Sequence, residues 1–450
     1  MHLTFIGATQ TVTGSKYLIT SGSRKVLIDC GLFQGFKFLR LKNWAPPPFD
    51  PREIDAVVLT HAHIDHSGYI PLLVKKGYRG KIFCTTATRE LCKILLPDSG
   101  YLQEEQASYL GRHNLSKHSP PEPLYTEEDA QRCLKQFESV RHHEDIDLGE
   151  GLTARFSRAG HLLGAACVRI AGNGTSILFS GDLGRPDDLL CVEPEPPQPS
   201  DYLVLESTYG DRLHPKLDPH SELETAINHV QSRGGIMVVP AFAVGRAQVL
   251  MLLIHRLKTS GRIADIPVYL DSPMAIDASS LYRQFPAEHK LQPDEVRQAF
   301  GAVRFVRTAD ESKQLDTIRT PAIILSASGM ATGGRVVHHL KRFAPDPRNL
   351  ILLTGHQAGG TRGASIAAGT RTVRIHREDV PINAQVMQML SLSGHADADQ
   401  LVAWAGRMSR PRRAFITHGE PSASDALRQR LEHELQWDVE VPEYREEHAL

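Results

Sequence analysis

The chain has 450 residues, 41% of them apolar and 23% charged, and its 51 basic and 52 acidic side chains leave a net charge of −1. This balance excludes a disordered or fibrous protein and allows buried cores for two domains. The near-zero net charge neither requires a polyanionic partner nor excludes one, because a basic groove can lie within a neutral total.

The N-terminal sequence and the cysteines predict a cytoplasmic protein. Residues 1–15, MHLTFIGATQTVTGS, lack the basic start and long apolar stretch of a signal peptide, and no apolar run approaches the length of a bilayer span. The six cysteines are scattered without a CxxC pair, which is typical of reduced thiols. We therefore expect no membrane partner.

The first 200 residues are predicted to be mainly strands with a few helices. Short β-branched or apolar runs between Gly, Ser and Thr turns predict strands at 2–7, 16–20, 25–29, 55–60, 151–157, 165–170 and 175–181. Apolar residues at helical spacing predict helices at 67–77, 87–96 and 126–138. The last of these begins with a threonine cap at Thr126. The proline-rich and acidic segment 191–200, CVEPEPPQPS, predicts a linker or a long surface crossing.

The pattern changes after this segment. Strand-like runs occur at 202–207, 235–240, 266–271, 322–328 and 349–355, and they alternate with helical segments such as 220–233 and 246–258. This alternation predicts a parallel sheet covered by helices. From about residue 375 the pattern returns to strands with intervening helices. Strands are predicted at 382–390 and 412–419, and a helix at 424–435. The polar tail, 443–450, is predicted to fray.

The densest chemical signal is THAHIDH, residues 60–66, which follows the predicted strand 55–60. Alternate side chains of an extended chain share a face, so His61 and His63 can point toward one ion. Asp65 and His66 lie past the strand end and can serve a second ion. Zinc suits this mixture of imidazole and carboxylate, although manganese and iron accept the same ligand types. Because four ligand-type residues at this spacing have few structural uses, the motif predicts a metal site.

Four further candidates also follow apolar runs: Asp29 in KVLIDCG, His161 in RAGHLLGA, Asp182 in LFSGDLG and His418 in FITHGE. Taken alone, each has an ordinary alternative, since a lone histidine is commonly structural and an aspartate commonly caps a turn. Together with residues 60–66, they form five strand-end sites. Convergence of these sites on one edge of a sheet would build a pocket for two metal ions.

In this order the motifs resemble those of the metallo-β-lactamase superfamily. Asp29 resembles its first motif, residues 61–66 the second, His161 the third and Asp182 the fourth. The resemblance implies two zinc ions per chain, with Mn²⁺ as an alternative. It implies one ion held by His61, His63 and His161, and another held by Asp65, His66 and His418. It also implies that Asp182 bridges the ions together with a hydroxide, and that Asp29 orients the cluster through hydrogen bonds.

The later part of the chain resembles the β-CASP group of this superfamily. Residues 203–210, LVLESTYG, resemble the acidic motif that opens the β-CASP insertion, and SLSGHAD and FITHG resemble the other two motifs. The segments PAFAVGRAQ, LDSPMA, SASGMATGGR and TGHQAGGTRG are also typical of the group. The resemblance covers nearly the whole chain. It implies an α/β (α+β) fold, an αββα metallo-β-lactamase sandwich built from 1–204 and 376–450, with a β-CASP α/β domain inserted at 205–375.

Within the β-CASP group, histidine at both 395 and 418 favours RNA over DNA as the substrate. Only a short stretch follows His418, so the chain more closely resembles the compact bacterial and archaeal relatives of the RNA 3′-end processing endonuclease than the RNase J type. We therefore expect a zinc-dependent ribonuclease that hydrolyses single-stranded RNA endonucleolytically. Dimers are frequent in the group, so a homodimer stays open.

Three alternatives to this function stay open. The first is a 5′-exoribonuclease of the same group. The second is a hydrolase of small thioesters or lactams, which the inserted domain disfavours because it would roof the pocket. The third is a non-catalytic RNA-binding scaffold, which a complete ligand set disfavours.

Roles for further residues also follow from the resemblance. His395 is expected to protonate the leaving oxygen, with Glu206 favouring its protonated form, which gives products with 5′-phosphate and 3′-hydroxyl ends. Ser328 and Gly329 lie in a glycine-rich stretch able to form an anion nest. Arg246 is a candidate for phosphate contact and Phe242 for base stacking. Each of the last four has a structural alternative in a turn, a helix end or the core. Arg362 in GTRG is expected either to contact phosphates or to be a solvated loop arginine.

Overall fold

The computed structural model describes residues 1–113, 121–355 and 357–450. The chain forms two compact units, one made of Met1–Leu213 with His395–Leu450 and the other of His214–Gly394. His356, in the predicted TGHQAGGTRG loop, lies outside the described residues. Within the described ranges, none of the helices has both the length and the apolar character that crossing a bilayer requires.

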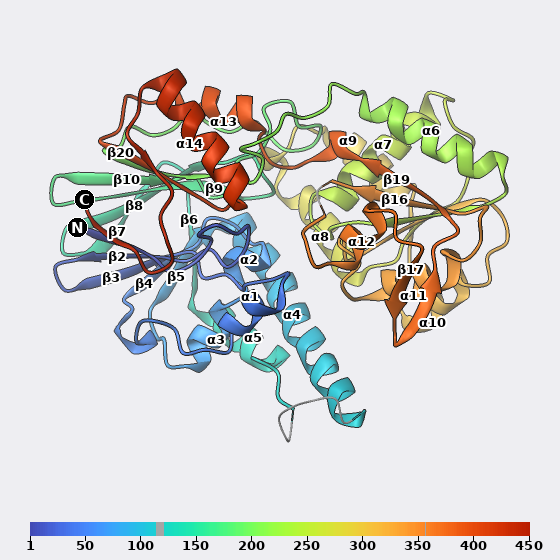
Figure 1. Cartoon of the computed structure of the whole chain (residues 1–450), viewed down its shortest axis with the longest axis horizontal. Helices are drawn as coiled ribbons and strands as arrows, with labels where there is room; N and C mark the ends of the chain where they lie inside the picture. The colour runs from blue at the N-terminus through green and yellow to red at the C-terminus, as the bar shows by residue number, and fades with distance from the viewer. Residues whose placement is uncertain (114–120, 356) are drawn as a thin grey trace. The chain divides into compact units, whose positions relative to one another are not determined.

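Two seven-stranded sheets form the first unit (Figure 1). The first sheet has the order β22 (Glu447–Ala449), β1 (His2–Phe5), β2 (Tyr17–Ser21), β3 (Arg24–Ile28), β4 (Ala56–Val58), β5 (Lys81–Thr85) and β6 (Phe137–Val140). The second has the order β21 (Val439–Glu440), β20 (Arg413–Thr417), β11 (Tyr202–Glu206), β10 (Thr175–Phe179), β9 (Ala166–Gly172), β8 (Leu152–Arg158) and β7 (Asp145–Gly149).

The two sheets share one apolar core. Alternate residues of β2 and β8 are buried, so each strand turns one face toward the opposite sheet. Phe5 and Ile19 of the first sheet belong to the same buried cluster as Phe156 and Phe415 of the second. The two sheets therefore pack face to face and bury their apolar side chains between them, as the predicted sandwich requires.

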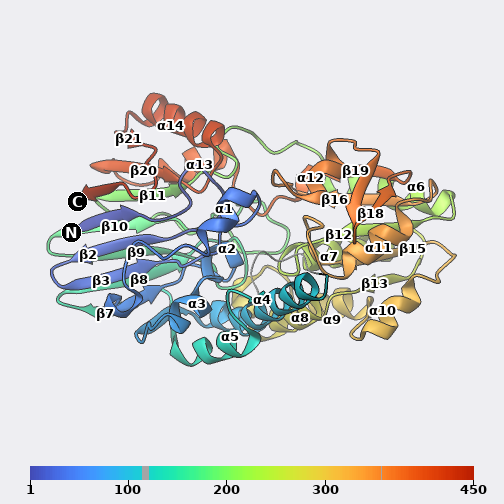
Figure 2. The same cartoon turned by 60° about the horizontal axis from the view of Figure 1, so that its bottom comes forward.

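Helices cover the outer faces of the sandwich (Figures 1 and 2). The helices of the first unit are α1 (Lys37–Lys42), α2 (Ile64–Ser67), α3 (Ile70–Lys75), α4 (Thr86–Arg112), α5 (Glu127–Cys133), α13 (Ala398–Ala405) and α14 (Pro421–Leu435). Helix α4 contacts β5 and β6, and α14 contacts β20 and β21. With helices outside both sheets, the αββα layering expected from the sequence is confirmed.

Three local predictions differ from the structure. The threonine cap is confirmed, since Thr126 Oγ1 accepts the Asp129 N–H at 3.1 Å. However, the helix ends at Cys133 because the chain from Phe137 pairs with β5 as strand β6. The predicted helix 87–96 extends through Pro97 to Arg112. The tail predicted to fray instead forms β22, which pairs with β1 through its backbone hydrogen bonds.

The second unit contains a six-stranded sheet in which every pairing is parallel, as predicted. Its order is β14 (Arg304–Phe305), β13 (Val268–Leu270), β15 (Ala322–Ser326), β12 (Ile236–Pro240), β16 (Leu350–Thr354) and β19 (Gln385–Met389). A separate hairpin joins β17 (Thr372–Ile375) to β18 (Glu378–Pro381).

The helices of this unit are α6 (Pro219–Ser232), α7 (Arg246–Thr259), α8 (Pro273–Gln284), α9 (Pro293–Gly301), α10 (Ala309–Leu315), α11 (Arg335–Phe343) and α12 (Arg362–Ala367). Short 3₁₀ turns occur in the two units at Pro51–Glu53, Leu134–Gln136, Pro286–Glu288 and Leu390–Leu392. The apolar faces of α11 and the sheet share one buried cluster that includes Val238, Ile324 and Leu340.

The boundaries of the second unit lie later in the chain than the sequence analysis placed them. Residues 205–213, assigned to the inserted domain, belong to the first unit, whose strand β11 runs to Glu206. Residues 376–394, assigned to the C-terminal part of the sandwich, belong to the second unit. The reason is that β19 completes the parallel sheet by pairing with β16.

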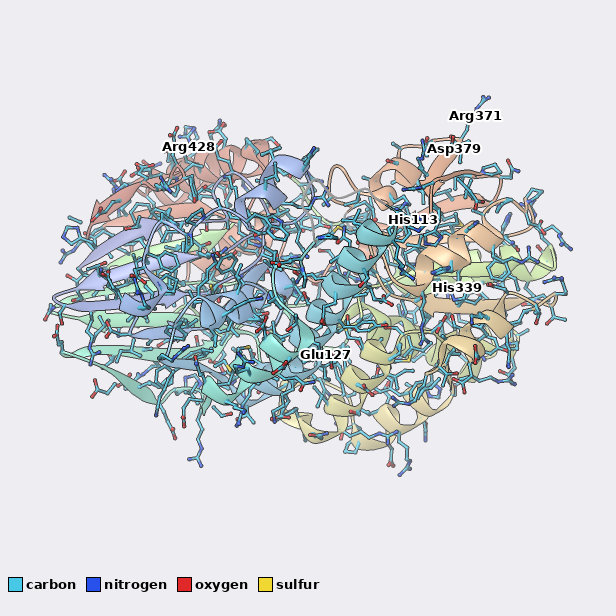
Figure 3. The ribbon with its side chains drawn as sticks, turned by 90° about the horizontal axis from the view of Figure 1, so that it is seen from below. His113, Glu127, His339, Arg371, Asp379 and Arg428 are labelled. Atoms are coloured by element: carbon cyan, nitrogen blue, oxygen red, sulfur yellow. The ribbon has the colours of Figure 1, made fainter. Side chains whose placement is uncertain are left out.

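A buried charge cluster connects β13, α10 and α11 in the second unit. Asp271 is fully buried after β13 and accepts hydrogen bonds from Ser312 Oγ at 2.5 Å and Arg335 Nη1 at 2.7 Å. His339, labelled in Figure 3, places Nε2 2.6 Å from the same carboxylate. Burial alone would raise the pKa of Asp271, but the hydrogen bonds from His339 and Ser312 outweigh it and lower the pKa. The carboxylate therefore remains ionised and holds these elements together.

Candidate metal centre

Strand direction explains why the predicted ligands meet. Strands β10, β11 and β20 are parallel neighbours, and β8 runs in the same direction because it is antiparallel to β9, which is antiparallel to β10. His161, Asp182, Glu206 and His418 follow or end these four strands, so they lie at one edge.

The other sheet of the sandwich supplies the remaining candidates. Asp29 follows β3, and residues 60–66 follow the parallel strand β4. The five strand-end sites therefore converge as predicted. However, they come from facing edges of two sheets and not from one sheet.

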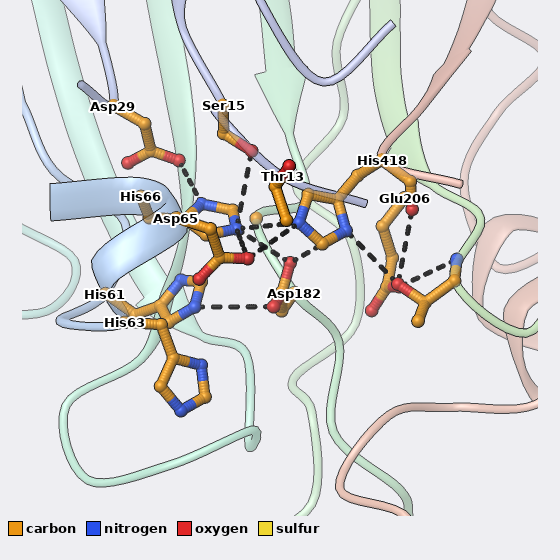
Figure 4. Close-up of polar contacts among 12 residues, drawn as sticks. Thr13, Ser15, Asp29, His61, His63, Asp65, His66, Asp182, Glu206 and His418 are labelled. Carbon is orange, nitrogen blue, oxygen red and sulfur yellow. Dashed lines mark hydrogen bonds and ion pairs between the residues drawn. The ribbon is translucent and has the colours of Figure 1, made fainter. Parts of the chain in front are cut away.

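The predicted ligands form two groups of donor atoms, which Figure 4 shows in part. The first group is His61, His63, His161 and Asp182. The second is Asp65, His66 and His418. Within each group, one donor atom per residue lies within 4.8 Å of all the others. Nitrogen and carboxylate donors at this mutual spacing suit a metal cofactor.

The first group converges through Nε2 of His61 and His161, Nδ1 of His63 and one oxygen of Asp182. Asp182 Oδ2 is 3.4 Å from His61 Nε2 and 3.6 Å from His161 Nε2. His161 Nε2 is 3.2 Å from His63 Nδ1. Three imidazoles and one carboxylate match the composition of a tetrahedral zinc site.

The second group lies against the other oxygen of Asp182. His66 Nε2 is 3.1 Å from Asp182 Oδ1 and 3.1 Å from His418 Nε2. His418 Nε2 is in turn 3.3 Å from Asp65 Oδ2. Because its two oxygens face different groups, Asp182 is placed where a bridging ligand between two ions would lie.

Hydrogen bonds aim the imidazoles of residues 61 and 66. Asp29 Oδ2 lies 2.7 Å from His66 Nδ1, so that nitrogen donates and Nε2 keeps its lone pair toward the centre. Thr60 Oγ1 donates to Asp29 and lies 3.1 Å from His61 Nδ1. Because the Thr60 hydrogen is engaged by Asp29, His61 Nδ1 must be the donor, which leaves its Nε2 free to ligate.

A second threonine orients His418 in the same way. Thr208 Oγ1 donates to the His418 carbonyl at 3.2 Å and lies 3.2 Å from His418 Nδ1. The ring therefore donates through Nδ1, and its Nε2 faces the second group. Sequence reasoning assigned no role to Thr60 or Thr208, although both stand in the quoted motifs. A hydroxyl residue beside a ligand at a strand end is the signal that would have identified them.

The protonation states favour ligands over salt bridges in the first group. Burial lowers the pKa of His61 and His161, and it takes the pKa of His63 to about 3. These three rings are therefore neutral, as a metal ligand must be. For Asp182, burial would raise the pKa, but His418 and His66 outweigh it and keep the carboxylate ionised.

The second group concentrates negative charge. Burial would lower the pKa of His66 and His418, but the Asp182 carboxylate outweighs burial and raises both. Burial would raise the pKa of Asp65, but His418 and His66 lower it. Without a metal, the carboxylates therefore keep His66 and His418 protonated. A bound metal cation would neutralise the same carboxylates in place of these two protons.

Two buried atoms at the centre lack a hydrogen-bond partner among the described residues. They are Nε2 of His61 and Oδ1 of Asp182, whose polar neighbours at 3.4 Å and 3.1 Å are not aligned for a hydrogen bond. An unpartnered buried polar atom is costly, and native structures commonly satisfy such an atom with water or an ion. Since both atoms face the neighbouring ligands, the residues present fit a bound metal.

Two of the candidates adopt unusual backbone conformations. Asp29 has φ of 56° and His418 has φ of 52°, in the left-handed region that non-glycine residues seldom occupy. Each is held there by its neighbours, since Asp29 N–H donates to Val58 O at 3.0 Å and His418 N–H donates to Ala8 O at 2.7 Å. Such strain collects at functional sites because it turns a side chain into a position that regular structure does not reach.

Close backbone contact brings the loops of His161 and Asp182 together. A Cβ atom at Gly184 would lie 1.9 Å from the carbonyl oxygen of Gly160. Gly184 N–H donates to Ala159 O at 2.8 Å at the same crossing. Any side chain at 184 would therefore separate the two loops and the two ligands that they carry.

Next to the first group, Glu206 contacts His395. Its Oε1 lies 3.2 Å from His395 Nδ1 and accepts the Leu183 N–H at 2.6 Å. His395 Nδ1 is also 4.0 Å from Asp182 Oδ2. Burial would lower the pKa of His395, but the charge of Glu206 and its hydrogen bond raise it to about 9. His395 therefore carries a proton at neutral pH beside the metal donors.

The candidates for RNA contact lie in the second unit. A Cβ atom at Gly329 would lie 2.7 Å from the ring of Phe242, so these two residues pack together. Ser328 Oγ accepts the Thr332 N–H at 3.1 Å, and Arg246 is the first residue of α7. Of the two alternatives for Arg362, the structure excludes the solvated loop arginine, because Arg362 begins α12 and donates to the carbonyls of Arg374 and Ala331.

The role of Asp29 leads to a prediction about metal affinity. We expect Asp29→Asn to weaken zinc binding by about 10–100-fold, because the amide removes the charge that fixes the proton on His66 Nδ1. Zinc titration against a chromogenic chelator measures the affinity. Asp55→Asn is a matched control, since Asp55 pairs with Arg24 away from the ligands. Native affinity in Asp29→Asn would contradict this role.

Comparison with known proteins agrees with this geometry. Residues 24–241 match the β-lactamase superfamily domain, residues 247–366 match the β-CASP domain, and residues 379–442 match the Zn-dependent metallo-hydrolase RNA specificity domain. Ribonuclease TTHA0252 of Thermus thermophilus is 38% identical over 436 residues, which cover 95% of each chain. The chain belongs to the β-CASP group of metallo-β-lactamase ribonucleases. The family resemblance predicted from the motifs is confirmed.

Further proteins are similar to this chain over most of its length. The RNase J-like protein of Methanocaldococcus jannaschii is 31% identical over 433 residues, covering 93% of this chain and 92% of that protein. Transcription termination factor FttA of the same archaeon is 31% identical over 445 residues, covering 94% of this chain and 67% of that protein. A protein of unknown function from Enterococcus faecalis shares the fold, with a TM-score of 0.55 and 14% identity over 100% of this chain and 99% of that one.

Proposed function

We propose that the protein is a zinc-dependent ribonuclease that cleaves single-stranded RNA endonucleolytically. The observation that carries the proposal is Asp182, whose two oxygens face separate groups of metal donors while a protonated His395 stands beside it. The match of residues 379–442 to an RNA specificity domain and the ribonuclease relatives support RNA as the substrate.

The proposed metal complement is two zinc ions, with Mn²⁺ as an alternative. His61, His63 and His161 would hold one ion, and Asp65, His66 and His418 the other, with Asp182 shared between them. When bound, such a pair lowers the pKa of water and neutralises charge that builds on phosphoryl oxygens. Asp29 and Thr60 hold the rings of His66 and His61 so that their Nε2 atoms would be available to the ions.

In this mechanism His395 delivers the proton to the leaving 3′-oxygen. Glu206 accepts the Leu183 N–H, which fixes the carboxylate, and the carboxylate holds the proton on the His395 ring. Loss of the 3′-oxygen as a hydroxyl leaves the phosphate on the 5′ end of the other product. General acid catalysis of this kind contributes about 10²–10⁴-fold to a rate.

The pairing of His395 with Glu206 predicts a pH effect. Because activity requires protonated His395, it is full below the pKa of this ring, which Glu206 raises to about 9, and it falls as the pH rises through that value. In Glu206→Gln the charge is lost, so the alkaline limb of the kcat/KM profile moves to lower pH. The readout is the difference between the two profiles, because any effect of bound cations on this ring is common to both proteins. If the alkaline limbs of the native and Glu206→Gln profiles coincide, Glu206 does not set the pKa of His395.

The cleavage mode is tested with an internally labelled single-stranded RNA whose 5′ end is either free or blocked, in buffers with zinc or manganese. Endonucleolytic action gives internal fragments from both substrates at equal rates. A strict requirement for a free 5′ end would establish the 5′-exonuclease alternative instead. Chromogenic lactam and thioester substrates assayed beside the RNA test the small-molecule alternative, for which turnover without RNA cleavage would be decisive.

Three further assignments remain proposals. Ser328, Gly329, Arg246 and Phe242 are proposed to contact RNA. A cytoplasmic location is proposed because all six cysteines are buried thiols without disulfide partners. A homodimer is proposed on the frequency of dimers in the β-CASP group, and light scattering after gel filtration measures it.

A further inference from the structure

Helix α1 and the residues that flank it expose large apolar side chains on the sandwich unit. Phe36 is 48% exposed, Phe38 63%, Leu41 56% and Trp44 54%. The rings of Phe36 and Phe38 lie nearly parallel, with centroids 5.8 Å apart and an angle of 17° between their planes. Contiguous exposed apolar groups mark a binding surface more often than scattered single ones do. We call Phe36, Lys37, Phe38, Arg40, Leu41 and Trp44 the α1 patch.

The α1 patch is held in place by the residues beneath it. Leu39, in the middle of the helix, is buried. The Asn43 side chain accepts the Phe33 N–H at 2.9 Å and donates to the Phe33 carbonyl at 2.8 Å, which closes the segment into a loop. The exposed rings are therefore presented by an anchored helix, so their exposure is not the result of a frayed end.

Positive charge accompanies the rings. Between residues 30 and 49 the sequence has no acidic residue, while Lys37, Arg40 and Lys42 are basic. In the described part of the chain, none of these three cations forms an ion pair with an acidic side chain. Lys42 Nζ lies 4.4 Å from the ring centroid of Tyr444, which extends the aromatic surface to the C-terminal segment. Glu443 is the acidic residue next to it, and Arg445 follows on the other side.

The α1 patch lies close to the metal centre. Helix α1 stands beside α2, which carries Asp65 and His66, in both Figure 1 and Figure 2. The Leu32 N–H donates to Ile64 O at 2.9 Å, in the residue before Asp65. Four residues of extended chain span at most about 14 Å, so Phe36 lies within that distance of Leu32. A strand of RNA at the metal centre could therefore reach the patch with a few nucleotides.

We propose that the α1 patch binds single-stranded RNA. Unpaired bases stack on Phe36, Phe38 and Trp44, while Lys37 and Arg40 pair with the phosphates between them. This inference rests on the proposed function, because the α1 patch would add a second binding surface for the RNA that the metal centre cleaves. Lys37, between the rings of Phe36 and Phe38, argues against a protein partner or a second copy of the chain, since lysine is depleted from the cores of protein interfaces.

The test is fluorescence anisotropy of a labelled 20-nucleotide oligouridylate with the full-length protein in zinc-free buffer. We expect Phe38→Ala with Trp44→Ala to raise the Kd by about 100-fold, because each of the two lost stacks weakens binding by about tenfold. We expect Lys37→Gln with Arg40→Gln to reduce the slope of log Kd against log salt by about 1 to 2. Phe305→Ala and Arg371→Gln are the controls, since they remove an exposed ring and an exposed cation of the second unit.

The outcomes separate the patch from the proposed function. Native affinity and salt slope in both double variants would overturn the patch, whatever the native protein cleaves. A native protein that binds this RNA through the patch but cleaves no RNA would overturn the proposed function alone. A change of oligomeric mass in the variants at native RNA affinity would assign the surface to contacts between copies of the chain and overturn the RNA proposal. Circular dichroism melting confirms that each variant folds.

Discussion

Asp182→Asn should abolish RNA cleavage and reduce the bound zinc. The carboxylate faces both donor groups, at 3.4 Å from His61 Nε2 and 3.1 Å from His66 Nε2. Asparagine keeps its shape but loses the charge and one acceptor, so neither group keeps a complete ligand set. We expect kcat/KM to fall by more than about 100-fold, because loss of a partner that only supports a ligand already costs about 10–100-fold. Elemental analysis and single-turnover cleavage measure the two effects.

The control for this variant is Asp187→Asn, five residues further along the chain. Asp187 is an exposed carboxylate that accepts hydrogen bonds from Arg185 at 2.6 Å and 3.0 Å. It should retain native zinc content and activity. RNA binding should survive in Asp182→Asn, since the substitution leaves the basic and aromatic surfaces in place. Cleavage by Asp182→Asn at the native rate would refute the shared-ligand role.

His395→Ala should lower kcat by about 10²–10⁴-fold and leave the zinc content unchanged. The ring lies outside both donor groups, and its Nδ1 is 4.0 Å from Asp182 Oδ2. The loss should be confined to substrates whose leaving group needs a proton. In an RNA with sulfur in place of the bridging 3′-oxygen, the leaving group is a stable thiolate that needs no proton. His395→Ala should therefore cleave this RNA at nearly the native rate.

This comparison distinguishes proton transfer from a merely structural role. If His395 only shaped the site, the sulfur-containing RNA would be cleaved as poorly as the ordinary one. His433→Ala is the matched control, because His433 is an exposed histidine on α14 of the same unit. Zinc loss in His395→Ala would count against the assignment, since it would place the ring among the ligands.

The α1 patch shows a limit of sequence reasoning. The sequence GFKFLRLKNW has apolar residues at helical spacing, a pattern that a buried helix face shares. Only Leu39 among its helical apolar residues is buried, and the Asn43 contacts with Phe33 determine which side faces inward. Exposure depends on what the rest of the fold places against a helix, and local spacing does not contain that information.

The domain boundary at residue 394 illustrates the same point. Residues 382–390 were correctly predicted to contain a strand, and β19 occupies Gln385–Met389. A strand's own residues determine its extended conformation and its apolar character, but not its partner. The pairing with β16 assigns β19 to the second unit, and that pairing joins residues that are 35 positions apart, such as Leu350 and Gln385.

By itself the sequence predicted which residues would gather as candidate metal donors, because ligation depends on residue type and HxHxDH is too dense a cluster for a structural use. It also determined the parallel sheet of the second unit, whose alternating apolar runs and helices are local patterns. Only the tertiary structure decided that the donors come from two facing sheets and that Thr60 and Thr208 set the histidine tautomers. It alone decided that the polar tail completes a sheet. These features depend on contacts between distant parts of the chain, which form when strands choose partners and sheets bury a common core.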